Sequence, residues 1–137
     1  MWRWLRRLTA REPAPLTGAP AVRRIKTYSA ESGYVYEYYY QGRRRARRPG
    51  APGVEYVFNV SADRRTFAPV TVFLPDESVE TWEEKHDDEL TSTERYAVVK
   101  LALFQAFDER ANPARMRHEV RIRLADIEEI LSRLDYE

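Results

Sequence analysis

The sequence predicts a two-layer α+β sandwich, in which helices pack on one face of an antiparallel sheet of three to four strands. Apolar and aromatic residues alternate with a period of two between residues 33 and 74, which indicates strands with one buried face. Residues 96–107 are apolar around most of a helical circumference, which is typical of a helix that lies buried across a sheet. The expected order is strand, strand, strand, helix, helix, strand, helix (β-β-β-α-α-β-α).

Four strands are expected, and the first three should form an antiparallel meander because their connections are short. Their ranges are 33–41, 54–61, 67–74 and 118–124. Residues 42–53 contain two prolines and three glycines, so a loop is expected there. Residues 63–66 are expected to form a tight hairpin turn.

Three helices follow from capping residues and apolar spacing. Asp76 is expected to cap a helix that has acidic first turns and ends near residues 85–88. Thr91 and Glu94 form a capping box before the apolar helix, which should end before Asn112. Asp126 is expected to cap a last amphipathic helix. Its apolar stripe is Ile127, Ile130, Leu131 and Leu134.

The 137-residue chain is predicted to hold one domain, over residues 21–137, preceded by a basic, proline-containing tail over residues 1–20. Cysteine is absent, which excludes disulfides and thiolate metal sites. No apolar run approaches the roughly 20 residues that span a bilayer. We therefore expect a cytoplasmic protein, with peripheral membrane contact through residues 1–8 as an alternative.

Charge is strongly segregated along the chain. Residues 1–48 carry twelve Lys or Arg against three Glu, a net of +9. Residues 75–90 carry eight Asp or Glu against one Lys, a net of −7. Such asymmetry marks either a surface for a charged partner or two segments that offset one another within the fold.

Nothing in the sequence has the spacing of a catalytic or cofactor motif. His86 stands beside Asp87 and Asp88, a grouping that suits either a divalent cation or the solvated end of an acidic helix. The second interpretation is favoured, because consecutive helical residues point in different directions. We therefore expect no catalytic residues, no metal, no cofactor and no small-molecule substrate.

Tyrosines stand at alternate positions from residue 34 to residue 40, so they should share one face of the first strand. They are Tyr34, Tyr36, Tyr38 and Tyr40. This face is either a core wall or a platform on which nucleic-acid bases stack. Because Glu37 makes the opposite face more polar, the tyrosine face is expected to lie inside, beneath the helix of residues 96–107.

The predicted function is a non-enzymatic accessory subunit or adaptor that contacts a larger protein. The expected contacts are Trp2, Arg3, Trp4, Arg6 and Arg7 in the tail, and Arg43, Arg44, Arg45, Arg47 and Arg48 in the loop. Tryptophan and arginine are common interface anchors. The alternative function is single-stranded nucleic-acid binding, with the tyrosine strand stacking on bases and the 43–48 arginines following the phosphates.

Overall fold

The computed structural model describes residues 14–134 and shows an α+β fold, as the sequence predicts. Within these residues the strands are β1 (Lys26–Ser29), β2 (Val35–Arg48), β3 (Ala51–Ser61), β4 (Ala68–Pro75) and β5 (Val120–Arg121). They form one sheet in the order β1-β2-β3-β4-β5. The helices are α2 (Asp76–His86), α3 (Ser92–Glu109) and α4 (Leu124–Leu134), with a 3-10 helix η1 (Pro113–Arg117).

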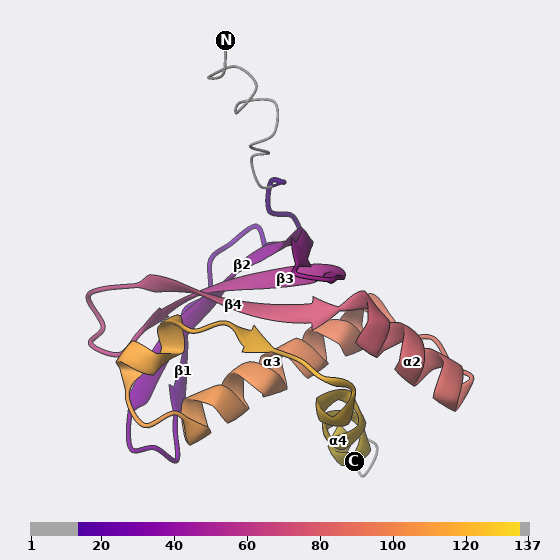
Figure 1. Cartoon of the computed structure of the whole chain (residues 1–137). Helices are drawn as coiled ribbons and strands as arrows, with labels where there is room; N and C mark the ends of the chain where they lie inside the picture. The colour runs from indigo at the N-terminus through magenta and orange to yellow at the C-terminus, as the bar shows by residue number, and fades with distance from the viewer. Residues whose placement is uncertain (1–13, 135–137) are drawn as a thin grey trace.

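The helices lie on one side of the sheet, and the chain from residue 14 reaches it from the opposite side (Figure 1). We call these sides the helix face and the outer face. Strands β1 to β4 are antiparallel, so the predicted meander is confirmed for β2, β3 and β4. The described chain contains no helix with the length and apolar character needed to cross a bilayer.

The tyrosine face of β2 is packed against α3. The ring pairs are Tyr36 with Phe107 at 4.3 Å between centroids, Tyr38 with Phe104 at 5.6 Å and Tyr40 with Tyr96 at 4.9 Å. Tyr36 and Tyr38 are buried and Tyr40 is half-buried. The expected inward orientation is confirmed for these three rings. Tyr34 precedes the strand and remains 39% exposed.

The predicted loop over residues 42–53 is wrong. Strand β2 continues through the arginines to Arg48, and β3 starts at Ala51, so only Pro49 and Gly50 separate them. The cause is tertiary, because carboxylates from other elements pair with several of these arginines. The strand that was expected to begin at residue 54 therefore begins three residues earlier.

A β-bulge at Gln41 reverses which side chains of β2 face the helices. Tyr40 pairs with Phe58, but the next pair along is Gly42 with Val57, so Gln41 is an extra residue. Even-numbered residues face the helices before the bulge, and odd-numbered residues do so after it. Gly42 has φ +126°, and a Cβ there would lie 2.7 Å from the Thr17 carbonyl oxygen.

Strand β1 lies in a stretch for which no strand was predicted. It pairs with β2, and its Tyr28 ring stacks on Phe104 with 4.3 Å between centroids. The Tyr28 hydroxyl donates to Asp108 at 2.8 Å. Burial and this contact with a carboxylate raise the pKa of Tyr28 to about 12. Contacts with α3, some eighty residues away in sequence, therefore fix this short strand.

The predicted strand over residues 118–124 is mostly replaced by other structure. Only β5, two residues long, pairs with β4, and it does so in parallel rather than antiparallel. Pro113 starts η1 on one side and Leu124 starts α4 on the other, which leaves little chain for a strand. The sheet is therefore mixed and has five strands within the described residues.

Capping is confirmed at α3 and differs at the other two helices. The Glu94 N–H donates to the Thr91 side chain at 3.1 Å, and the Thr91 N–H donates to the Glu94 side chain at 3.0 Å. Asp76 is not the N-cap of α2, because Pro75 occupies that position. Helix α4 starts before Asp126, which accepts a hydrogen bond from the backbone N–H of Arg123 at 2.8 Å.

Candidate partner-binding surface

The N-terminal segment contacts the fold at residues 43–48, the arginine-containing half of β2. Thr17 and Arg43 exchange two backbone hydrogen bonds, of 2.9 and 2.8 Å. The Ala14 carbonyl accepts from Arg44 at 3.4 Å. The tail residues predicted as contacts lie outside the described part of the chain. They are Trp2, Arg3, Trp4, Arg6 and Arg7. Ala14 and Thr17 therefore lie beside the arginine-containing half of β2.

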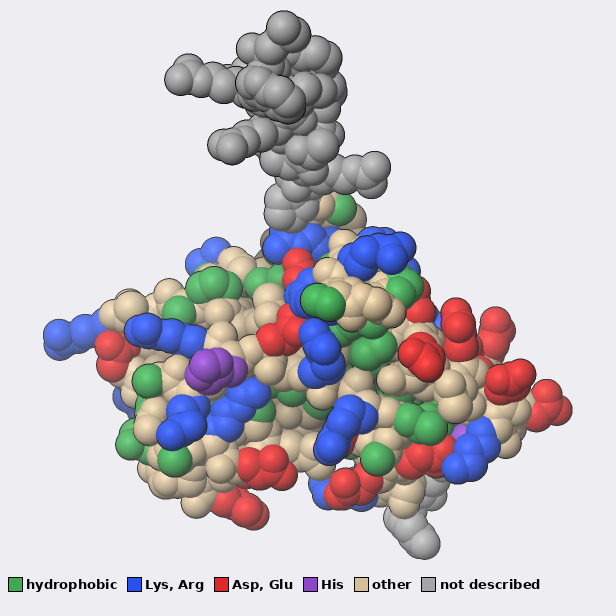
Figure 2. Space-filling model, in the orientation of Figure 1, with side chains coloured by type: hydrophobic (Ala, Val, Ile, Leu, Met, Phe, Trp, Pro, Cys, Tyr) green, Lys and Arg blue, Asp and Glu red, His purple; other side chains and the backbone are tan. Residues whose placement is uncertain are grey.

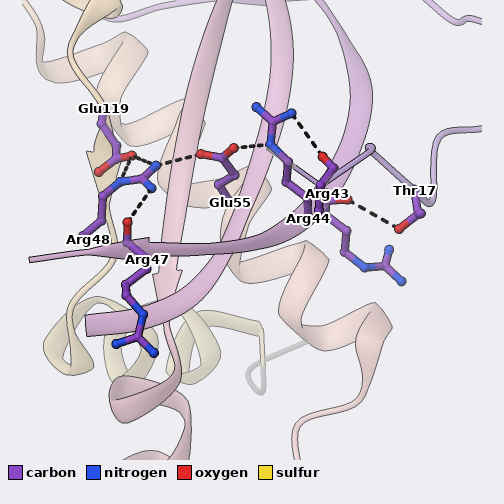
Figure 3. A network of polar contacts seen from close by, with 8 residues as sticks. Thr17, Arg43, Arg44, Arg47, Arg48, Glu55 and Glu119 are labelled. Atoms are coloured by element: carbon purple, nitrogen blue, oxygen red, sulfur yellow. Dashed lines mark hydrogen bonds and ion pairs between the residues drawn. The ribbon is translucent and has the colours of Figure 1, made fainter. Parts of the chain in front are cut away.

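Two of the predicted contact arginines are held in an ion-pair network on the outer face (Figure 3). Glu55 is 8% exposed and accepts from Arg44 Nε and, at 2.7 Å, from Arg48 Nη2. Arg48 Nε also donates to Glu119 at 2.9 Å. Burial acts to raise the pKa of Glu55, but the hydrogen bonds from the two arginines outweigh it and keep this pKa below its usual value.

An aromatic ring lies under this network. The Arg48 guanidinium lies 4.7 Å from the centroid of the Phe73 ring, and the Arg121 guanidinium lies 5.7 Å from it. Phe73 is fully buried. A Cβ at Gly53 would lie 2.6 Å from that ring and 2.5 Å from the Leu74 carbonyl oxygen, so glycine at this position leaves room for Phe73. Arg44 and Arg48 therefore stabilise the sheet.

The odd-numbered arginines emerge on the helix face. Arg45 donates to Asp76 at 2.8 Å, and this hydrogen bond lowers the pKa of Asp76. The basic and acidic segments of the sequence therefore meet at this point. Arg47 is exposed and makes no ion pair within residues 14–134, and its guanidinium points away from Glu55 in Figure 3. Arg45 and Arg47 are the predicted arginines most open to a partner.

A second exposed feature lies at the β1 edge of the sheet, and the sequence reasoning missed it. Of the described residues, four large hydrophobic side chains are markedly exposed, and all of them belong to this edge. They are Val22 (68%), Ile25 (51%), Val35 (44%) and Tyr34 (39%). Among residues 14–134, strand β1 pairs only with β2, so its other edge is open to other chains within this part of the structure. The available signal was the β-branched and aromatic residues Val22, Ile25, Thr27 and Tyr28, which are interrupted by three basic residues.

The acidic group around His86 does not assemble into a site. The His86 ring stacks on Trp82 at 4.5 Å, and its Nε2 lies 2.9 Å from a Glu128 carboxylate oxygen, which links α2 to α4. Asp87 ends the helix in a left-handed conformation. Between residues 14 and 134, no three His, Cys, Asp or Glu side chains are grouped in a way that suits a metal ion.

Comparisons of this chain with protein-family models, with curated proteins and with solved structures find no match. A function must therefore be inferred from the chain's own residues. Three described surface features are distinctive for this purpose: the attachment point of the N-terminal segment, two exposed arginines near the β2–β3 turn, and an apolar sheet edge at β1.

Proposed function

We propose that this protein is a non-enzymatic adaptor, which binds a larger protein through its N-terminal segment and the adjoining part of the sheet. The observation that carries this proposal is the pairing of Thr17 with Arg43. It brings residue 17, which follows the basic, tryptophan-containing residues 1–13 in sequence, beside the arginine-containing half of β2.

The chain between Thr17 and β1 adds a second exposed area, toward the other end of β2. Arg23 lies over the Tyr39 ring at 4.3 Å, on the outer face. Val22 and Ile25 are exposed immediately before β1, and Val35 is exposed on the paired strand. An apolar centre with arginine and aromatic residues around it resembles the composition of protein interfaces. The open edge of β1 also offers backbone groups to which a partner strand can pair.

The charge of the surface indicates an acidic partner. Arg47 makes no ion pair with any described residue, and the tail adds four arginines, two tryptophans and a single glutamate. An acidic protein surface with apolar side chains at its centre would be complementary to this arrangement. The acidic surface of this chain itself lies over α2, at the right of Figure 2, and meets the exposed arginines at the Arg45–Asp76 ion pair.

The test is affinity purification of the tagged full-length protein from its source cells, with and without nuclease treatment before capture. Three variants are compared: deletion of residues 1–13, Arg47→Glu, and Arg65→Glu as a matched control at the exposed β3–β4 turn. A partner is then purified and its affinity is measured by calorimetry. We expect about tenfold weaker binding for the first two variants and unchanged binding for the control.

Three outcomes would contradict the adaptor function. One is a protein that runs as a monomer in cell extract and captures no partner above background. Another is a partner that binds all variants equally. The third is capture of nucleic acid that disappears on nuclease treatment, which would favour the nucleic-acid alternative. Because Tyr36, Tyr38 and Tyr40 pack on α3, that binding would depend on arginine–phosphate contacts and weaken steeply with salt.

Peripheral membrane contact through residues 1–8 is distinguished by co-sedimentation with anionic vesicles. Two tryptophans and three arginines in these residues would bind anionic headgroups and be released by salt. Vesicle binding that is lost on deletion of residues 1–13, with no protein partner, would replace the adaptor proposal.

A further inference from the structure

A pocket of about 350 Å³ lies at the end of the sheet, between the β3–β4 turn and η1. Its walls are mostly apolar and aromatic, and they include Tyr34, Tyr36, Val60, Val70, Pro113 and Met116. Its volume falls within the range of roughly 300–1,000 Å³ that is typical of small-molecule sites. None of the residues proposed for the adaptor surface contributes to it except Tyr34.

The Tyr36 hydroxyl is buried and has no hydrogen-bond partner among the described residues. Buried hydroxyls are normally paired, so an unpaired one at a pocket wall indicates a missing partner. The stacking of its ring on Phe107 fixes the position of the hydroxyl oxygen, so the oxygen cannot move toward a more distant acceptor. Burial raises the pKa of Tyr36, so the group stays protonated and able to donate at neutral pH.

One cationic side chain at the pocket is available to an anion. Arg117 lines the pocket, is exposed, and forms no ion pair with any residue between 14 and 134. Asp63 also lines it, but its carboxylate accepts hydrogen bonds from the backbone N–H groups of Arg65 and Thr66, both at 2.8 Å. Lys and Arg side chains also gather at this end of the molecule, at the left of Figure 2.

We infer that this pocket binds a small carboxylate with an aromatic or short aliphatic body. The apolar walls take the body, and the carboxylate pairs with Arg117 and accepts a hydrogen bond from the Tyr36 hydroxyl. The apolar volume alone would admit a neutral molecule. The unpaired arginine and the unpaired phenolic donor are what select a negatively charged acceptor.

The test uses the full-length protein in an NMR titration with benzoate, hexanoate and, as an uncharged probe, benzyl alcohol. Backbone amides of residues 60–70 and 113–117 report on the pocket. We expect saturable shifts with at least one of the two carboxylates and much weaker binding of benzyl alcohol. Tyr36→Phe and Arg117→Gln should each weaken carboxylate binding by about tenfold.

Two matched variants serve as controls. Tyr40→Phe removes another buried hydroxyl without a partner from the same strand, outside the pocket, and Arg115→Gln removes an exposed arginine of η1 that does not line it. Both should bind like the unchanged protein, and near-UV circular dichroism should show that every variant is folded. The proposal is overturned if neither carboxylate gives saturable shifts up to its solubility limit, or if benzyl alcohol binds as tightly as benzoate. Binding that Tyr36→Phe and Arg117→Gln leave unchanged would overturn it as well.

Discussion

At the scale of single residues, Glu55 explains how an arginine-rich segment becomes part of a sheet. Its carboxylate accepts from Arg44 and Arg48 across the β2–β3 pair, and Glu119 binds Arg48 from beyond β4. Adjacent arginines repel one another unless carboxylates lie between them. The network therefore compensates for a charge density that would otherwise favour an exposed loop.

Replacing Glu55 with Gln tests this compensation. We expect the free energy of unfolding to fall by about 2 kcal/mol at pH 7, because charge-assisted hydrogen bonds to a buried group are lost. The pKa of Glu55 is lower in the folded protein than its ordinary value of 4.5. The stabilisation is therefore complete above pH 4.5 and is lost as the pH falls through the folded-state pKa.

The measurement is denaturant unfolding of both proteins between pH 7 and pH 3. Their difference in unfolding free energy should shrink below pH 4.5. Glu129→Gln is the control, since this side chain pairs with Arg133 at the exposed surface of α4 and should matter by less than about 1 kcal/mol. A difference that stays constant over the whole pH range would contradict the role given to Glu55.

Gly42 permits the attachment of the N-terminal segment. In Gly42→Ala, the new Cβ would collide with the Thr17 carbonyl at a positive φ, so we expect a loss of about 1–3 kcal/mol and release of the Thr17–Arg43 pair. Gly33→Ala is the control, because it has a positive φ but no atom within 4 Å of its Cβ. Hydrogen exchange at Thr17 should accelerate in the first variant only. Equal exchange in both would show that backbone strain, rather than the collision, matters.

At the scale of elements, local signals determined α3 well and β2 only in part. The capping box and the apolar run place α3 without any knowledge of its neighbours, and the structure bears this out. The β-bulge at Gln41 in β2 reverses the sheet face toward which each later side chain of the strand points. Nearby residues do not predict such a bulge, because its partners are distant in sequence. These partners are Thr17, which pairs with Arg43, and strand β3.

The capping box gives a prediction for α3. Thr91→Ala should cost about 1 kcal/mol of stability, because the Glu94 N–H loses its acceptor at the helix start. Ser92→Ala, one residue later and without a capping contact, should change stability by less than about 0.5 kcal/mol. Thermal unfolding followed by circular dichroism separates the two variants. Equal effects would mean that the box contributes little beyond helix propensity.

At the scale of the whole molecule, aromatic packing between β2 and α3 joins the sheet to the helices. Tyr36 and Phe107 are both fully buried, and their rings stack 11° from parallel. These residues come from opposite halves of the chain, so neither layer buries its aromatic face alone. We therefore expect sheet and helices to unfold together.

Phe107→Ala tests the packing between β2 and α3. It should lower the free energy of unfolding by about 3–5 kcal/mol, the usual cost of a large aromatic cavity. Glu109→Ala, on the exposed side of the same helix, should have little effect. Far-UV circular dichroism and tyrosine fluorescence should give coincident transitions in both variants. Separate transitions would show that the layers fold independently.

The candidate site could be predicted only in part. The tail and the arginine cluster stand out by composition, but the roles within the cluster do not. Arg44 and Arg48 pair with Glu55 on the outer face, whereas Arg45, which is exposed and pairs with Asp76, and the exposed Arg47 lie on the helix face, because alternate strand residues face different layers. The β1 edge and the pocket beside η1 were missed, since each is assembled from segments that are distant in sequence.

By itself the sequence determined the α+β class, the meander, the capping of α3 and the inward face of the tyrosines. These depend on periodicity and on contacts between near neighbours, which any stretch of chain carries within it. Only the tertiary structure decided that the arginines extend a strand, that β1 completes the sheet and that residue 17 lies beside residue 43. Each of these results from pairing between residues that are far apart in sequence, so a short stretch of sequence contains only one of the two partners.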